Sequence, residues 1–323
     1  MFFIPWSNIF DKLTPLSATI QEELDNNEAF EGIIVYISQD GEAFTYASGY
    51  HNRAKEIPAK TDALFKIASI TKLYVAVATT KLIDEGILSL EDTLADLLPK
   101  FKDNIEHSDE ITLKQLIMHR SGIPNYTDHN FDWAAPPYSN EACLSLVLDM
   151  PSDFKPDKKY AYSNTNYLLL GMIMNEALGY NYMDYIDSEI LTPLKLDNTS
   201  HLLEDIDIDQ LMSGYVKGYE PDIKQNNFRS PAGSMIATAE DVGVFIRALN
   251  DGSLLSDSEQ DIFSNVYVYS HTGFLPGYQS IARYDKETDT VIILFGNTSE
   301  GSKWNEIEVL FNRIKRILKS EKK

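Results

Sequence analysis

Strand-like segments stand at both ends of this chain, and a long helical stretch separates them. Near the N-terminus, residues 32–38 and 43–48 are joined by Asp40-Gly41, a dipeptide typical of a two-residue hairpin turn. Further strand-like runs lie near the C-terminus, at residues 265–271, 278–284 and 290–295. We therefore predict an α+β fold: an antiparallel sheet from N- and C-terminal strands, flanked by helices, with an inserted and mostly helical region.

This arrangement gives approximate boundaries. Residues 1–63 and 236–323 are expected to form the sheet-containing part, and residues 64–235 the helical insertion, together one compact catalytic unit. Helices are also expected at residues 8–26 and 303–318, where apolar side chains recur at helical spacing. No low-complexity linker or internal repeat divides the sequence.

Composition limits the classes of partner. The 323 residues carry a formal net charge of -21 and are 43% hydrophobic, which indicates a globular protein that repels nucleic acid and anionic membrane surfaces. No apolar run reaches the ~18 residues of a membrane span. Without a recognisable export signal the expected location is the cytoplasm, or the periplasm or exterior if a signal had been removed. The oligomeric state stays open. Cys143 is the single cysteine and is expected to be a buried small hydrophobe.

Ser69 and Lys72 form the first chemical motif. Residues three apart on a helix share one face, with Cβ atoms about 5–6 Å apart, so an amine comes within reach of a hydroxyl. A serine hydroxyl becomes a good nucleophile only when a neighbouring base takes its proton. Ser-x-x-Lys also occurs at Ser152 and Ser320, but only Ser69 opens a long apolar helix, which Gly86 is expected to end.

Two further motifs follow in order. Tyr162-Ser163-Asn164 precedes a second apolar helix, whereas the Tyr-x-Asn at Tyr138 follows two prolines in a predicted loop. His271-Thr272-Gly273 occurs once, at the end of a strand-like run. The backbone N–H groups of Ser69 and Phe274 are candidates for an oxyanion hole. Each residue taken alone also has a structural interpretation: Ser69 could be a helix N-cap, Tyr162 a half-buried aromatic residue and His271 a residue at a strand end. The occurrence of all three motifs in this order favours a catalytic role instead.

The motifs together resemble those of the serine β-lactamase and penicillin-binding DD-peptidase superfamily. Because the second motif begins with tyrosine, the chain most resembles one branch of this superfamily. That branch contains class C β-lactamases, D-alanyl-D-alanine carboxypeptidases, D-aminopeptidases and family VIII esterases. Other stretches that look like this family are Phe65-Lys66-Ile67-Ala68-Ser69, Asp84-Glu85-Gly86-Ile87-Leu88-Ser89-Leu90-Glu91-Asp92, Ile111-Thr112-Leu113-Lys114-Gln115-Leu116, His119-Arg120-Ser121-Gly122-Ile123-Pro124, Pro231-Ala232-Gly233 and Thr238-Ala239-Glu240-Asp241.

The resemblance implies a role for each motif residue. Ser69 would be the acylated nucleophile, Lys72 its amine partner and Tyr162 the general base. Substrate would be bound by Asn164, His271, Thr272, Gly273 and Phe274. His271 stands where β-lactamases more often have lysine, and a free imidazole titrates near pH ~6.5, so this site would carry only a fraction of a positive charge at neutral pH. His119 is expected to order a loop near the cleft.

The expected function is a serine acyl hydrolase that forms a covalent acyl-enzyme with an amide or ester. It would be an esterase, a D-Ala-D-Ala carboxypeptidase or a weak β-lactamase, acting on a small-molecule or peptide-like acyl substrate. The alternative is a non-hydrolytic or slowly acylating penicillin-binding-type sensor. No cofactor or metal is implied, since no His-Glu-x-x-His, paired-cysteine or Gly-x-Gly-x-x-Gly motif is present.

Overall fold

Strands from the two ends of the chain form one antiparallel sheet. The computed structural model describes residues 16–300 and 305–321, and within them the sheet has six strands in the order β3-β2-β1-β10-β9-β8. β1 pairs with β10 along its length, which joins the N-terminal and C-terminal parts directly. The predicted α+β arrangement is therefore confirmed. The strands are β1 Gly32–Gln39, β2 Glu42–Asn52, β3 Ile57–Pro58, β8 His271–Leu275, β9 Tyr278–Asp285 and β10 Thr290–Gly296.

The N-terminal hairpin forms as predicted. Asp40 and Gly41 both have positive φ angles, 53° and 82°, as a two-residue hairpin turn requires. The short strands form smaller sheets, in which β4 and β5 pair with β7, and β6 pairs with β11. Their bounds are β4 Phe65–Lys66, β5 Thr199–Ser200, β6 Tyr215–Val216, β7 Ile236–Ala237 and β11 Thr298–Ser299.

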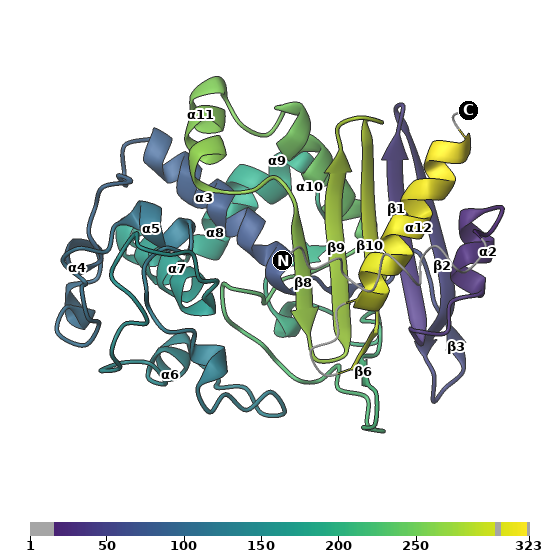
Figure 1. Cartoon of the computed structure of the whole chain (residues 1–323), viewed down its shortest axis with the longest axis horizontal. Helices are drawn as coiled ribbons and strands as arrows, with labels where there is room; N and C mark the ends of the chain where they lie inside the picture. The colour runs from purple at the N-terminus through teal and green to yellow at the C-terminus, as the bar shows by residue number, and fades with distance from the viewer. Residues whose placement is uncertain (1–15, 301–304, 322–323) are drawn as a thin grey trace, which may run out of the picture.

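Helices cover both faces of the sheet. In Figure 1, α12 and α2 cross one face, while the helical region lies beyond β8 and behind the sheet. The α-helices are α2 Ile20–Asp25, α3 Thr71–Asp84, α4 Leu94–Leu97, α5 Leu113–Ile117, α6 Asn140–Leu144, α7 Asn164–Leu178, α8 Tyr182–Ile186, α9 Thr192–Leu194, α10 Ala239–Asp251, α11 Asp257–Val266 and α12 Asn305–Glu321. The 3-10 turns η1 Ala68–Ile70, η2 Pro99–Phe101, η3 Tyr126–Asp128 and η5 Leu203–Asp205 and the π-helical segment η4 Asp187–Leu191 connect them.

The central strands are apolar on both faces because each face meets a different layer. On β1, Ile33 and Val35 pack with α2 and α12, whereas Ile34 and Tyr36 join the large cluster that extends through the helical region. That cluster contains fully buried residues of α3, α7 and α10 as well as of β10. The proposed division at residues 63/64 and 235/236 thus crosses a continuous core.

Two expectations need correction. The predicted helix at residues 8–26 begins at Ile20 in the described part of the chain, because Thr19 is an N-cap in a capping box with Glu22; residues 8–15 lie outside the described residues. The predicted strand at residues 265–271 is wrong. α11 continues to Val266, a loop follows, and β8 begins only at His271.

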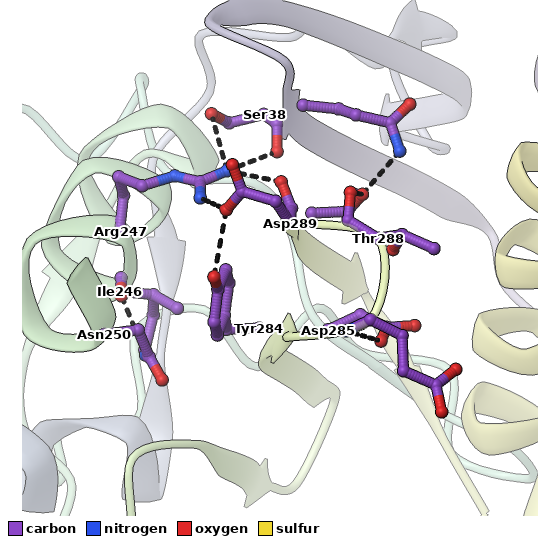
Figure 2. A network of polar contacts seen from close by, with 11 residues as sticks. Ser38, Ile246, Arg247, Asn250, Tyr284, Asp285, Thr288 and Asp289 are labelled. Carbon is purple, nitrogen blue, oxygen red and sulfur yellow. Dashed lines mark hydrogen bonds and ion pairs between the residues drawn. The ribbon is translucent and has the colours of Figure 1, made fainter.

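The α10 helix is held to the sheet by a polar network around Arg247 (Figure 2). Arg247 donates to the carbonyl of Ser38 at the end of β1 (2.8 Å) and to the carbonyl of Asp289 in the β9–β10 turn (3.0 Å). It also pairs with the carboxylate of Asp289, which accepts from the hydroxyl of Tyr284 at 2.9 Å. These bonds tie α10 to strands from both ends of the chain.

Two smaller predictions concern burial and membranes. Cys143 is buried, and burial raises the pKa of its thiol to about 11, as suits a structural residue. Over residues 16–300 and 305–321, none of the helices combines the length and the apolar character needed to cross a bilayer.

Candidate active site

Ser69 lies in η1, a 3-10 turn that runs directly into α3. The preceding residue, Ala68, has a φ of 52°, a left-handed value that costs a non-glycine residue about 1–3 kcal/mol. β8 lies against this turn: a Cβ added to Gly273 would be 2.3 Å from the carbonyl oxygen of Ile67 and 3.0 Å from Cβ of Ala68. The His-Thr-Gly strand therefore faces the segment that carries Ser69.

Lys72 is fully buried in the first turn of α3. Its Nζ lies 3.0 Å from Oγ of Ser69, and it donates to Oδ1 of Asn164 at 2.8 Å and to the carbonyl of Ala232 at 2.6 Å. Burial removes the hydration of an ammonium group and lowers the pKa of Lys72 well below its usual value. Nζ thus donates to three oxygens, and its lowered pKa makes Lys72 readier than an exposed lysine to give up a proton.

Tyr162 stands just before α7 and hydrogen-bonds to Ser69. Nζ of Lys72 lies 4.9 Å from the centroid of its ring. The ring is 37% exposed, yet desolvation by the surrounding side chains raises the pKa of the Tyr162 phenol above its usual value. The phenol therefore keeps its proton at neutral pH, and the two groups beside Ser69 are a protonated phenol and an amine with a lowered pKa.

Asn164 is fixed by two loop residues that are not part of any of the three motifs. Its backbone N–H donates to Oδ1 of Asn125 at 2.9 Å, and its Nδ2 donates to Oγ1 of Thr127 at 3.2 Å. This loop directly follows the His-Arg-Ser-Gly-Ile-Pro stretch, where Pro124 accepts a hydrogen bond from Thr165 of α7 at 2.6 Å. These bonds hold the Asn164 side chain in one orientation, with its Oδ1 toward Lys72.

His271 differs from the expectation for a free imidazole. Its Nδ1 lies 2.5 Å from the carbonyl of Thr272 and so carries the hydrogen that this bond requires. Burial, together with the nearby Lys72, lowers the pKa of His271 to about 4. The expected partial charge at neutral pH is therefore wrong: the imidazole is neutral over the whole physiological range.

His119 lies beneath Tyr162. It is 2% exposed, has a φ of 56°, and its Nδ1 accepts from the N–H of Ser163 at 3.2 Å. Its ring centroid is 4.4 Å from that of Tyr162. Burial, with smaller contributions from Lys72 and His271, lowers the pKa of His119 to about 3, so it is neutral as well. The predicted loop-ordering contact is confirmed.

The competing motif copies lie elsewhere. Ser152 is in a loop, where its N–H donates to Glu106 at 2.7 Å. Tyr138 is 76% exposed and has Arg229 4.4 Å above its ring. The structure brings together Ser69, Lys72, Tyr162, Asn164 and the strand that carries His271, Thr272, Gly273 and Phe274. In the described ranges, no group of three His, Cys, Asp or Glu residues is placed to hold a metal ion.

Comparison with known proteins identifies the family of this chain. The Beta-lactamase family profile matches residues 16–267. The chain belongs to the Beta-lactamase family. The resemblance inferred from the sequence is therefore confirmed at the level of the family.

Relatives within and around this family are diverse. Penicillin-binding protein 4* of Bacillus subtilis is 24% identical, over 89% of this chain and 72% of its own length. Protein flp of Staphylococcus aureus is 28% identical over 79% of this chain, which corresponds to only 53% of that protein. D-amino acid amidase from Ochrobactrum anthropi SV3 superposes with a TM-score of 0.83 at 24% identity, over 94% of this chain and 98% of that one. This last likeness shows a shared fold.

Proposed function

We propose that this Beta-lactamase family member is a serine acyl hydrolase with Ser69 as nucleophile. The observation that carries the proposal is the 3.0 Å separation between Oγ of Ser69 and the buried Nζ of Lys72. Burial lowers the pKa of this amine and so favours its proton-accepting form, and a serine needs such an acceptor before it can attack a carbonyl carbon.

In the acylation step, Oγ of Ser69 forms a bond to the acyl carbon while its proton moves to Lys72. The bond from that carbon to the leaving nitrogen or oxygen then breaks. Tyr162 hydrogen-bonds to Ser69 and is protonated at neutral pH, so we assign to it the donation of a proton to the leaving group, after which it regains one from Lys72. We thus assign to Lys72 the acceptance of the Ser69 proton, and to Tyr162 the delivery of a proton to the leaving group.

Oxyanion stabilisation is assigned to the N–H groups of Ser69 and Phe274, because β8 lies against η1. Two such donors contribute about 10²–10³ in rate each. Water then attacks the acyl carbon by the same route in reverse, which releases the acid and restores Ser69. Asn164, whose Oδ1 accepts from Lys72, is assigned to the part of the substrate next to the scissile bond.

We assign short amides and esters without a carboxylate as the substrate class. Neutral His271 gives a carboxylate no full positive charge, which disfavours the β-lactams and peptide C-termini that carry one. The amidase with the same fold is named for D-amino acid amides, which are also uncharged at the amide end.

The test is to identify the acylated residue and to measure turnover. A fluorophosphonate should add to Ser69, as seen by peptide mass spectrometry, and Ser69→Ala should abolish hydrolysis of an activated ester with the fold retained. Ser152→Ala is the matched control and should keep full activity. An adduct on Ser152, or activity in Ser69→Ala, would refute the assignment. A burst of one product per protein without steady turnover would instead favour the slowly acylating sensor.

A further inference from the structure

A cavity of about 320 Å³ adjoins the active site, and Tyr162 and His271 form part of its wall. The rest of the wall comes from Met118 and His119, from Tyr160, and from the end of α11 with the following residues to Val268. Tyr160 and Val268 are 64% and 52% exposed, so the cavity is open to solvent beside them. A dry apolar cavity of about 150 Å³ is enough for benzene, so a six-membered ring fits here.

The other end of β8 is filled. Leu275 and Phe228 border a void of only about 20 Å³, about the space of one water molecule. Trp133 lines the same void and stacks on Phe228 with ring centroids 5.9 Å apart. Gly273, in the middle of β8, contacts the residues just before Ser69. A substrate laid along β8 therefore has room at the His271 end and little at the Leu275 end.

The proton transfer that we assign to Tyr162 determines which end of such a substrate lies at which end of β8. Tyr162 delivers the proton to the departing atom, so the departing group must lie next to Tyr162, and the wall that contains Tyr162 belongs to the larger cavity. The acyl part then points toward the filled end, where only a short chain fits. This orientation rests on the geometry of β8 and on the proton delivery assigned above to Tyr162.

The cavity wall is also uncharged. Of the described residues that line it, none is Lys, Arg, Asp or Glu, and its two histidines are both neutral at physiological pH. A carboxylate placed there would lose hydration without gaining a full positive partner, which is costly. The aromatic side chains of Tyr160, Tyr162 and Tyr267 also line the cavity, and aromatic side chains pack well against a planar group.

Resting on the acyl-hydrolase function proposed above, we infer that this cavity binds the leaving group, and that the preferred substrate joins a short acyl chain to an uncharged, ring-sized leaving group, as in an aryl ester. In the reaction, the bond from the acyl carbon to the aryl oxygen breaks as the bond to Oγ of Ser69 forms. The proton that Ser69 loses is matched by the one that Tyr162 places on the phenol oxygen.

The experiment compares two acetate esters that differ in one group: the ester of methyl 4-hydroxybenzoate and the ester of 4-hydroxybenzoate, which carries a carboxylate. Each kcat/KM is divided by the rate of the same ester with hydroxide, to remove intrinsic reactivity. We expect at least about a tenfold preference for the neutral ester.

Val268→Lys, at the exposed mouth, should raise the relative rate of the carboxylate ester about three- to fivefold, as a partly exposed ion pair allows. Val268→Gln, of similar size but uncharged, should leave the ratio as in the wild type.

A second measurement does not depend on turnover. The two free phenols are titrated into Ser69→Ala, and line broadening or calorimetry should detect binding of the neutral phenol and weaker binding of the carboxylate. Equal normalised rates for the two esters, an unchanged ratio in Val268→Lys, or equal binding of the two phenols would each overturn the inference. A failure of the proposed acyl-hydrolase function would give a different result. In that case Ser69 would form no adduct and neither ester would be hydrolysed, whether or not the phenols bind.

Discussion

At the scale of residues, two buried lysines flank Ser69. Besides Lys72, Lys66 is 5% exposed and donates to the carbonyls of Lys224 at 2.7 Å and Asn226 at 2.5 Å. Burial lowers the pKa of Lys66 to about 7, against a smaller opposite effect of Asp222. These two bonds fix the loop of Lys224 and Asn226, and either form of the amine has the two hydrogens that they need.

Lys66 should make stability depend on pH. Its folded pKa lies below the usual value of about 10.4, so between pH 7 and 10 the unfolded chain binds a proton that the folded protein does not. The free energy of unfolding should therefore rise with pH in this window, by up to ~1.4 kcal/mol per pH unit from this group. Urea unfolding of Lys66→Met at pH 7 and 9.5 should show a smaller rise than the wild type, whereas exposed Lys158→Met should not. Equal slopes in the wild type and Lys66→Met would contradict this.

Tyr162 and Tyr138 form a matched pair for the proton-delivery role. Tyr162→Phe removes the only hydroxyl that we assign to the leaving group, so kcat should fall by at least about 10²-fold, the lower range for general acid–base catalysis. Tyr138→Phe, at an exposed position, should change kcat little. Steady-state kinetics on one activated ester checks both, and similar losses in the two variants would place proton delivery elsewhere.

The charge of the His271 imidazole should not change near neutral pH. Since its pKa is lowered to about 4, the kcat/KM ratio of carboxylate-bearing to neutral substrates should stay constant from pH 5 to 8, even if both rates change as Lys72 gains a proton. His271→Lys should raise this ratio at pH 7. A ratio that climbs as pH falls through 6.5 would show that the imidazole is solvated instead of buried.

At the scale of elements, the approach of β8 to η1 sets the active-site geometry. Besides its contacts with η1, Gly273 has Oγ of Ser280 2.3 Å from where a Cβ would be, and that hydroxyl donates to the carbonyl of Ile67 at 3.0 Å. Any side chain at Gly273 must therefore push β8 away from the turn that holds Ser69.

Gly273→Ala should consequently impair catalysis more than stability. A displacement of about 1 Å can cost ~10²-fold in rate, and we expect a loss of that order in kcat/KM. Gly243→Ala is the control, because its Cβ would meet the Tyr36 ring at 2.2 Å in the core between α10 and β1. That variant should lose stability but keep the kcat of its folded fraction. Unchanged kcat/KM in Gly273→Ala would mean that β8 does not shape the reaction.

At the scale of the whole molecule, the sheet and the helical region share one large apolar cluster. Buried residues of β1 and β10 and of α3 and α7 all belong to it. We propose that residues 1–63 and 236–323 form, together with the insertion 64–235, a single cooperative unit, since neither part can expose its share of this core cheaply.

Native-state hydrogen exchange tests this cooperativity. The slowest amides of β10 and of α7 should exchange with the same free energy and the same dependence on urea, because both open only by global unfolding. Amides of the exposed β1–β2 hairpin turn should exchange faster and serve as the local reference. Protection that differs by several kcal/mol between β10 and α7 would show two separable units.

Much of this protein follows from local sequence. Asp40-Gly41 determines the hairpin, since both residues accept positive φ. Ser69 and Lys72 meet because a three-residue spacing brings them together on almost any helical turn. The order of the three motifs likewise identified the family before any contact was known.

Tertiary packing decided the rest. Residues 266–270 have strand-forming side chains, yet Tyr267 and Tyr269 pack on Phe263 of α11, with ring centroids 6.3 and 5.0 Å apart, and the strand starts later. The charge states of Lys72 and His271, the placement of His119 and the open cavity beside Tyr162 also come from packing. Spacing along a chain fixes which neighbours meet within a turn or two. Desolvation and cavity shape instead depend on segments a hundred residues apart, which only the folded chain brings together.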